Sequence, residues 1–373
     1  MGNMLDYLDW RGDLTLEQAP FNEVDNLVLA QLVYVNFDYV VPPEWIDASV
    51  SIREAAERYF HLYSEDRIQS FGHMVRNSVS LLGKVRHCAR FANAKLSKFQ
   101  NIVDLDRTKQ FAAMHVELED GTVYVAYRGT DSTIVGWKEN FNMTITTPVP
   151  SQFEAVRYLE DTAVEGSAPL RLGGHSKGGN LAAYAAVMCR ADVKSRIIEA
   201  YNNDGPGFDA KIARSDAYAE MRDRIRTIVP QSSVVGMLLE HEEAYAVVRS
   251  NQSLLMQHDA FSWEVMGPSF VRAEQVARES RVVEAALKSW LGQLAKPQRE
   301  QFVDALFQIF QSADVWTIED LSRAKWKKVT QMIRALNQSQ EHKIVLTKTL
   351  KLLFHEGRKS LMDMRENKPP QHP

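Results

Sequence analysis

The 373-residue chain has only two cysteines, no long apolar run and almost no net charge. Two cysteines exclude a disulfide framework and a zinc site built from CxxC pairs. No uninterrupted apolar segment approaches the roughly 18 residues of a membrane-spanning helix. The 44 Lys and Arg residues and 48 Asp and Glu residues leave a net charge of −4. This near balance gives no overall attraction to nucleic acid or to an acidic membrane.

We also expect no targeting signal in the first residues. Residues 1–7 show no basic stretch followed by an apolar one, so we expect no secretory leader. The composition, 45% hydrophobic and 25% charged, is that of a globular protein with enough material for a core. Two cysteines are most simply kept as buried, reduced thiols, which predicts a cytoplasmic location.

The N-terminal part of the chain has helical periodicity. Residues 23–40 are largely apolar and predict a buried helix, which the pair Pro42-Pro43 ends. From about residue 51 to residue 97 the apolar side chains recur at helical spacing. We therefore expect N-terminal helices and a helical insertion at about 51–97.

The middle of the chain alternates strand-like and helix-like segments. Residues 110–118 and 123–127 are β-branched or aromatic runs, and Asp120-Gly121 between them predicts a hairpin with a two-residue loop. The other strand-like runs are 102–104, 170–174, 197–202, 225–229 and 244–248. Helical segments separate the later runs, so the order predicts a mostly parallel sheet with helices on both faces.

The C-terminal part is helical by its apolar spacing from about residue 270 to residue 362. We expect two parts: a domain built on the sheet over residues 1–270, and a C-terminal helical region over residues 271–373. The polar, proline-containing tail from Glu366 onward is typical of a disordered terminus.

The most specific motif is the segment 174–179, which is GHSKGG. It follows an apolar strand-like run and opens an Ala-rich helical run. A serine in the pattern G-x-S-x-G lies on a sharp turn between strand and helix, and the small flanking residues avoid collisions. We interpret Ser176 as a nucleophile and expect the backbone N–H of Lys177 to face a substrate oxygen, with the Lys177 side chain exposed. A phosphate-binding turn is the alternative, but no GxxxxGK precedes the serine.

A serine hydroxyl needs a general base. Of the ten histidines, only His241 and His258 lie between Ser176 and the helical C-terminal region. His258 follows the last strand-like run, where a loop can carry its ring over the edge of the sheet. His241 lies among glutamates, which is typical of a solvated segment. We expect His258 to be the base, with His241 as the weaker alternative.

The acid of the site remains open at the level of sequence. Asp204 directly follows the strand-like run after the proposed nucleophile helix, so it could lie at the same edge of the sheet. The segment 203–207, NDGPG, explains the same residue as an ordinary turn former. The weaker options for the acid are Asp209, Asp259 and Glu240.

A second donor for a substrate oxygen is expected after an earlier strand. The segment 128–131 is RGTD. Gly129 permits a tight turn, and Thr130 offers both a backbone N–H and a hydroxyl. A plain turn at the end of a strand is the alternative.

These motifs resemble those of the class 3 lipase (fungal lipase-like) family of α/β-hydrolases. The resemblance rests on YRGT at 127–130 with Trp137, and on GHSKGGNLA at 174–182. The residues DYLDWRGD at 6–13 and the turn NDGPGF at 203–208 resemble more closely an uncharacterised bacterial branch of that superfamily. The lipase resemblance covers roughly residues 100–265, and the branch resemblance covers most of the chain.

The resemblance implies an α/β-hydrolase fold with a defined site. The residues that it assigns are the nucleophile Ser176, the base His258 and the oxyanion-hole residues Thr130 and Lys177. The sequence departs from the lipases at the acid. The lipase aspartate would follow the run 225–229, where residues 230–233 are PQSS. Asp204 is therefore the acid that we carry forward.

We hypothesise a serine hydrolase that cleaves an acyl ester, with lipids as the substrate class that the resemblance implies. No metal and no organic cofactor are implied. The helical insertion at about 51–97 is a packing layer or, as an alternative, a lid over the site. The alternative function is a non-catalytic scaffold with the same fold, whose C-terminal helices bind a protein partner. The missing lipase aspartate favours that alternative.

A cationic stretch near the C-terminus allows a third interpretation. Its residues are Arg323, Lys325, Lys327, Lys328, Arg334, Lys343, Lys348 and Lys351. Such a stretch can be a face for nucleic acid or an anionic membrane, but charges on helices are more often simply solvated. We therefore expect no nucleic-acid partner and no transmembrane segment, and peripheral membrane contact stays open.

Overall fold

The computed structural model describes residues 1–131, 134–143, 145–163, 166–313, 315, 326–338 and 340–366. The chain forms two compact units. The first unit contains Met1–Asp131 and Pro150–Gln275, and the second contains Ser132–Val149 and Val276–Pro373. The expected disordered tail lies outside the described residues, apart from Glu366.

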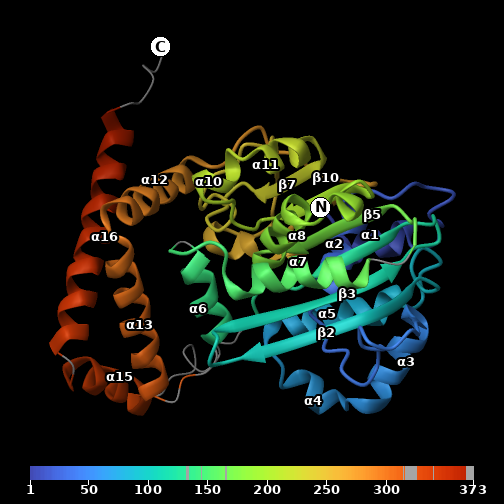
Figure 1. Ribbon diagram of the computed structural model, residues 1–373, viewed down its shortest axis with the longest axis horizontal. Coiled ribbons are helices and arrows are strands. Elements are labelled where there is room, and N and C mark those ends of the chain that lie inside the picture. Colours follow the sequence, from blue (N-terminus) through green and yellow to red (C-terminus); the bar gives the residue numbers. More distant parts are fainter. Residues whose placement is uncertain are drawn as a thin grey trace. The chain divides into compact units, whose positions relative to one another are not determined.

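An eight-stranded sheet, with its strands in sequence order, forms the centre of the first unit (Figure 1). The first three strand pairs are antiparallel, and the four pairs from β4 to β8 are parallel. The strands are β1 (Val50–Ser51), β2 (Lys95–Asp104), β3 (Lys109–Glu117), β4 (Val123–Tyr127), β5 (Leu170–His175), β6 (Ile197–Asn203), β7 (Ile225–Pro230) and β8 (Tyr245–Val248). The carboxyl ends of β4, β5, β6 and β7 therefore lie at one edge of the sheet.

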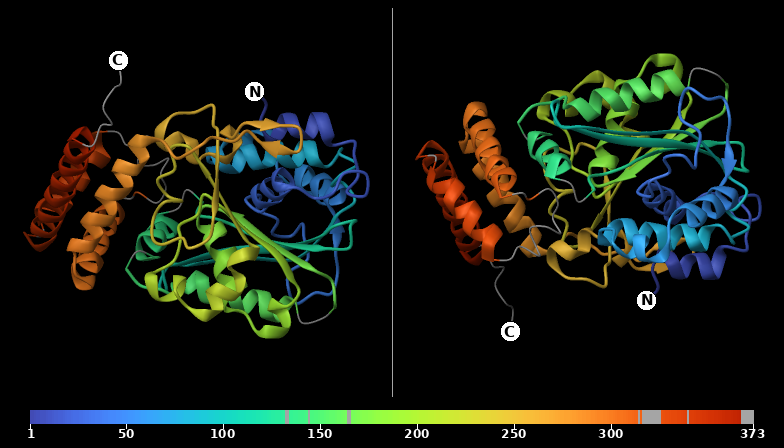
Figure 2. Two further views of the ribbon diagram at one scale, coloured as in Figure 1. Left: turned by 90° about the horizontal axis from the view of Figure 1, so that it is seen from above. Right: turned by 90° about the horizontal axis from the view of Figure 1, so that it is seen from below.

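Helices cover both faces of this sheet. Figure 2 shows the sheet between the N-terminal helices in blue and the helices α7 and α8 in green. The N-terminal helices are α1 (Met4–Arg11), α2 (Glu23–Leu32), α3 (Ile52–Leu62), α4 (Glu65–Gln69) and α5 (His73–Val85). The helices after β4 in this unit are α7 (Pro150–Thr162), α8 (Lys177–Met188), α9 (Ala191–Lys194), α10 (Ala210–Ala213) and α11 (Asp216–Met221). The predicted mostly parallel sheet with helices on both faces is confirmed.

Alternation along the strands creates the two cores. On β4, Tyr124 and Ala126 pack with the N-terminal helices, whereas Val125 and Tyr127 pack with α7 and α8. Successive side chains of a strand point to opposite faces, so a strand buried on both sides reads as a continuous apolar run. Because both faces of the sheet are buried, the carboxyl ends of the parallel strands are held in fixed positions.

Several predicted boundaries are wrong. The helix predicted over 23–40 ends at Leu32, and Asn36 beyond it accepts a hydrogen bond from the backbone N–H of Asp38 at 3.0 Å, a local turn that competes with a helix. The helical insertion expected to reach residue 97 ends earlier, because Lys95–Asp104 is strand β2, paired with β3. Such pairing depends on residues far away in sequence, which local periodicity cannot show.

The helical insertion packs as a layer on the sheet. The inward residues of α3 and α5, among them Tyr59, Leu81 and Leu82, are fully buried in the core that α2 shares. The hairpin between β3 and β4 is also confirmed, but Leu118 donates to the carbonyl of Thr122, so three residues, not two, form the loop inside this bond. Gly121 donates to the carbonyl of Leu118 and adopts a φ of 78°, which is the geometry of a turn followed by a bulge.

The second unit is helical. The helices among its described residues are α6 (Ile134–Met143), α12 (Arg278–Gln293), α13 (Lys296–Ser312), α15 (Trp326–Gln338) and α16 (Gln340–Glu366). Trp290, Phe302 and Phe307 are the largest side chains of its core, and the indole N–H of Trp290 donates to the carbonyl of Thr349 at 2.9 Å. None of the described helices is both long enough and apolar enough to cross a bilayer.

Candidate active site

Ser176 lies on a strained turn between β5 and α8. Its backbone φ is 57° and its ψ is −131°, a region that non-glycine residues rarely occupy. A Cβ at Gly174 would lie 2.3 Å from the carbonyl carbon of Gly178, and one at Gly178 would lie 2.2 Å from the carbonyl oxygen of Tyr127. Both glycines are therefore required for the close approach of helix and strands. This turn has the geometry of a nucleophile elbow.

The structure brings Ser176, His258 and Asp204 together in a hydrogen-bonded row. His258 Nε2 lies 3.0 Å from Ser176 Oγ, and His258 Nδ1 lies 2.6 Å from Asp204 Oδ2. Because the carboxylate only accepts, the proton of the neutral imidazole is on Nδ1, and Ser176 donates its hydroxyl hydrogen to Nε2. The arrangement has the order of contacts that a serine hydrolase uses.

Asp204 directly follows β6 and is the carboxylate that contacts His258. Its side chain is fully buried, and its backbone has a φ of 50°. Ser233, within the PQSS segment where the lipase aspartate was expected, donates its hydroxyl to Asp204 Oδ1 at 2.5 Å. Both carboxylate oxygens are therefore occupied, one by His258 and one by Ser233.

The RGTD segment lies against the elbow. A Cβ at Gly129 would lie 3.3 Å from the Cβ of Ser176 and 2.4 Å from the carbonyl oxygen of His175. The buried hydroxyl of Thr130 has no hydrogen-bond partner among the described residues. Arg128 anchors the segment by donating to Asn101 Oδ1 at 3.0 Å. A buried hydroxyl without a partner is costly, so an incoming acceptor would stabilise this site.

Lys177 is placed differently from the prediction for its side chain. We expected an exposed side chain, but Lys177 is 1% exposed, and its ammonium donates to the carbonyl of Gln110 at 2.7 Å. The prediction of an exposed Lys177 is wrong because the stem crosses the end of the sheet to β3. Its backbone belongs to the first residue of α8, whose N–H groups face the N-terminal end of the helix.

Buried amides connect the elbow to the turn that carries Asp204. The side-chain amide of Asn203 donates through Nδ2 to the carbonyl of Gly174 at 2.9 Å, and its Oδ1 accepts from Asn26 Nδ2 at 2.9 Å. Asn180, on α8, donates to the carbonyls of Pro206 and Gly207 at 3.0 and 2.8 Å. Asn180 and Asn203 therefore hold the two turns of the site in place through their side-chain amides. Sequence reasoning missed this role.

His175 is a second residue whose role sequence reasoning missed. It is fully buried, and its Nε2–H donates to the backbone carbonyl of His258 at 2.8 Å. The two rings lie 4.8 Å apart between centroids. Burial, together with the nearby His258, lowers the pKa of His175 well below its ordinary value. His175 therefore stays neutral and holds the backbone that carries the proposed base.

The remaining candidates lie in other local structures. His241, expected in a solvated segment, is 8% exposed in its side chain, and its Nδ1 lies 3.0 Å from Glu243. Asp209 caps α10, and Asp259 accepts from the backbone N–H of Phe261 at 3.1 Å. Glu240 pairs through its backbone with Phe208. We therefore give none of them a place in the row with Ser176.

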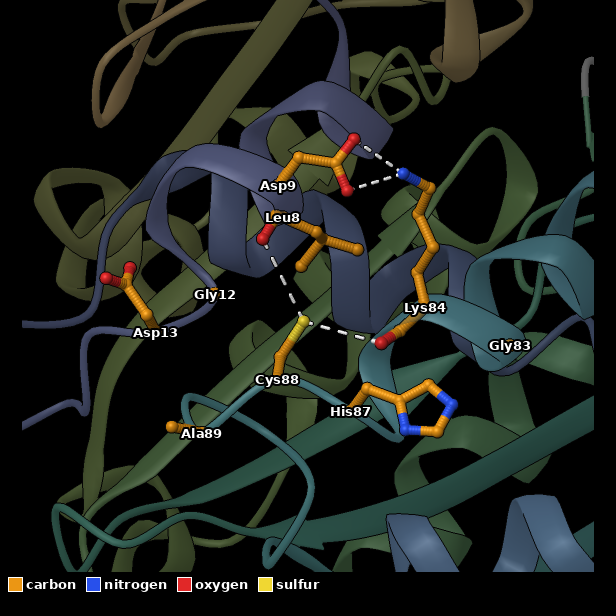
Figure 3. A pocket seen from close by; sticks show the side chains of 9 residues that line it. All are labelled: Leu8, Asp9, Gly12, Asp13, Gly83, Lys84, His87, Cys88 and Ala89. Atoms are coloured by element: carbon orange, nitrogen blue, oxygen red, sulfur yellow. Dashed lines mark hydrogen bonds and ion pairs between the residues drawn. The ribbon is translucent and has the colours of Figure 1, made fainter.

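A separate hollow of about 510 Å³ lies between α1 and α5. Figure 3 shows Asp9 and Lys84 facing each other there, with the ammonium 2.6 Å from both carboxylate oxygens. The Cys88 thiol points at the carbonyls of Leu8 and Lys84, and burial raises its pKa. Residues of the Ser176 site do not line this hollow. The described residues contain no group of three or more His, Cys, Asp or Glu side chains placed to hold a metal ion.

A family model described as Mbeg1-like matches residues 85–308, which is more than half of the chain. The chain belongs to the Mbeg1-like family. The matched range includes the strands β2–β8, the elbow and His258. With the parallel sheet and the strained serine turn, this Mbeg1-like protein has the lipase-like α/β-hydrolase fold that the sequence resemblance implied.

Comparison with solved structures finds lipases. The native Rhizomucor miehei lipase–propeptide complex has 14% identity and a TM-score of 0.37, with 61% of this chain and 68% of that chain covered. M37 lipase has 14% identity and a TM-score of 0.34, with coverage of 57% and 68%. A fungal lipase–inhibitor complex has 17% identity and a TM-score of 0.31, with coverage of 42% and 66%. No functionally curated protein matches the chain.

Proposed function

We propose that this Mbeg1-like protein is a serine hydrolase that cleaves acyl esters, with lipid esters as its substrate class. The row of Ser176, His258 and Asp204, with contacts of 3.0 and 2.6 Å, is the observation that carries the proposal. The lipase-like fold and the motif resemblance support the choice of an ester. The lipid class rests on the resemblance.

In the proposed reaction, Ser176 Oγ attacks the ester carbonyl while its proton moves to His258 Nε2. The fully buried Asp204 stabilises the positive charge that forms on the ring. His258 then gives the proton to the leaving alcohol, and an acyl group remains on Ser176. A water molecule, deprotonated by the same nitrogen, releases the acid and restores the serine.

The charge on the carbonyl oxygen needs donors that are in place before the reaction. In the proposal these are the backbone N–H groups of Thr130 and Lys177, with the Thr130 hydroxyl as a third donor. That hydroxyl is buried and has no partner among the described residues. The contact of Gly129 with the elbow supports this placement.

The scaffold alternative drew its support from the missing lipase aspartate. The contact of Asp204 with His258, from the residue after β6, supports Asp204 as the acid of the proposed site instead. We therefore argue for the hydrolase alone, and the scaffold becomes an outcome of the test.

The test is covalent labelling with a fluorophosphonate, followed by peptide mapping. We expect one modified residue, Ser176, with labelling lost in Ser176→Ala and strongly slowed in His258→Asn. The controls are Ser195→Ala, an exposed serine, and His241→Asn, the other candidate histidine. Folded protein that resists labelling would support the scaffold, and labelling lost equally in His241→Asn would contradict the choice of base.

Substrate class is tested with p-nitrophenyl esters of graded acyl length, followed by phospholipid and acylglycerol substrates. We expect hydrolysis that depends on Ser176 and a rate that rises with acyl length. Hydrolysis confined to acetyl esters would overturn the lipid class while leaving the serine esterase in place.

A further inference from the structure

Residues 343–359 of the last helix of the second unit present cations to solvent. In α16, Leu346, Thr349 and Glu356 are buried against the other helices. The exposed residues between 343 and 359 are Lys343, Ile344, Thr347, Lys348, Leu350, Lys351, Phe354, His355, Arg358 and Lys359. We call these ten residues the α16 face. At about 1.5 Å per residue, they extend over roughly 24 Å of helix.

The α16 face contains cations and no carboxylate. The only acidic residue between 343 and 359 is Glu356, which is 3% exposed and accepts the hydroxyl of Ser289 at 2.6 Å. Ordinary solvated helix surfaces mix both signs of charge. Here five Lys and Arg residues stand together in a chain whose net charge is −4. The positive charge is therefore local.

Apolar side chains stand among these cations. Phe354 is 73% exposed, Ile344 57% and Leu350 41%. Ile344, Lys351 and Phe354 are separated by seven and three residues, so they lie on one side of the helix. An exposed phenyl ring flanked by Lys and Arg is the pattern of a helix that lies on an anionic bilayer, with its ring among the headgroups.

We propose that the α16 face docks this protein on the surface of an anionic phospholipid membrane. Lysine and arginine head groups would bind lipid phosphates, and Phe354 with Ile344 would enter the headgroup region. The proposal goes beyond ester hydrolysis and does not depend on it, because α16 binds in the same way whether or not Ser176 reacts.

Two other occupants fit the α16 face less well. A second copy of the chain would place the same cations against one another, which is unfavourable. A nucleic acid would pair with the cations and could stack a base on Phe354, but it would offer no apolar partner to the exposed aliphatic side chains of Ile344 and Leu350. A lipid surface uses both kinds of side chain.

The experiment is flotation of the full chain with vesicles. One set is phosphatidylcholine alone, and the other contains phosphatidylglycerol as well. We expect binding to the anionic vesicles only, and release as the salt concentration rises. Ser176→Ala should bind like the wild type, so failed docking and failed hydrolysis are separate results. Equal binding to both vesicle types would overturn the proposal.

Two sets of variants locate the binding. Lys348→Gln/Lys351→Gln/Arg358→Gln should lower the partition coefficient on the order of 100-fold, since each cation near the surface contributes roughly fivefold. The control Arg53→Gln/Arg58→Gln/Lys211→Gln removes the same charge from exposed positions of the first unit and should bind like the wild type. Equal losses in both variants would overturn the assignment to α16.

Ile344→Ser/Phe354→Ser should lower binding by roughly tenfold or more, because a phenyl ring leaves the headgroup region. Its control, Val103→Ser/Leu105→Ser, changes two exposed apolar residues of the first unit and should have no effect. Vesicle binding that survives Ile344→Ser/Phe354→Ser, with equal affinity for a mixed-sequence RNA oligonucleotide, would identify a general polyanion site and refute the lipid proposal. Circular dichroism confirms that each variant is folded.

Discussion

Replacing Ser233, in the turn after β7, by alanine tests whether its bond to Asp204 helps to orient His258. Ser233 donates to Asp204 Oδ1, and the carboxylate is completely buried. The Ser233→Ala variant removes this hydroxyl from a carboxylate that is not exposed to solvent. Asp204 would keep a single strong partner, His258, and both side chains would lose a fixed orientation.

The size of the effect follows from the charge and the burial. A hydrogen bond to a charged group contributes about 1.5–3 kcal/mol, so we expect the free energy of unfolding to fall by that amount. Without a fixed orientation of the His258 ring, kcat should fall about tenfold, which corresponds to about 1.4 kcal/mol in activation free energy. KM should stay unchanged, because Ser233 contacts the side of Asp204 opposite His258.

The assay combines urea unfolding with the rate of fluorophosphonate labelling and with ester hydrolysis. Ser232→Ala is the matched control, since it is Ser232's backbone N–H, not its hydroxyl, that donates to Gln257 at 2.7 Å. Ser233→Thr should recover most of the rate. If Ser233→Ala loses stability but labels as fast as the wild type, Ser233 supports the fold alone and the reasoning about His258 is refuted.

Three further outcomes are expected. Burial raises the pKa of Glu243, but hydrogen bonds from His241 and two hydroxyls outweigh this and lower it to about 2. Glu243 therefore contributes about 3 kcal/mol of stability that is lost between pH 4.5 and pH 2, and the fall in the free energy of unfolding over this range, measured with urea, should be smaller by that amount in Glu243→Gln than in the wild type. Burial lowers the pKa of His115 to about 3 and that of His175 well below its ordinary value. Below pH 6.5 only the unfolded chain then binds these two protons, so the free energy of unfolding should fall by about 2.7 kcal/mol for each unit by which the pH is lowered. A slope unchanged in His115→Gln would contradict this. The free energy of unfolding of Ser176→Gly should be about 1 kcal/mol higher than that of Ser176→Ala, because glycine tolerates the φ of 57°. Equal thermal midpoints of the two variants would argue against strain at the elbow.

Much of the fold could be predicted because its signals are local. The strands alternate or run apolar, the helices repeat at helical spacing, and Asp120-Gly121 marks a hairpin. One error lies where a distant partner decides, because residues 95–97 have a helical pattern yet pair with β3. The other is local, because a side-chain turn at Asn36 follows α2 where the apolar pattern continues.

The site divides in the same way. The sequence could suggest Ser176 as the candidate nucleophile because strand, turn and helix stand next to it, and it could suggest His258 as the candidate base from the order of the chain. Asp204 remained one of two interpretations, since its partner His258 is 54 residues away. The buried stem of Lys177 and the bond from His175 to the backbone of His258 gave no sequence signal.

By itself, then, the order of amino acids determined where a serine meets a sharp bend and which segments build the sheet, since neighbouring residues specify both. Only the tertiary structure decided which carboxylate binds the imidazole and which hydroxyl holds that carboxylate. Parallel strands bring their carboxyl ends together whatever lies between them in the chain, so these contacts belong to the edge of the sheet and not to any one segment.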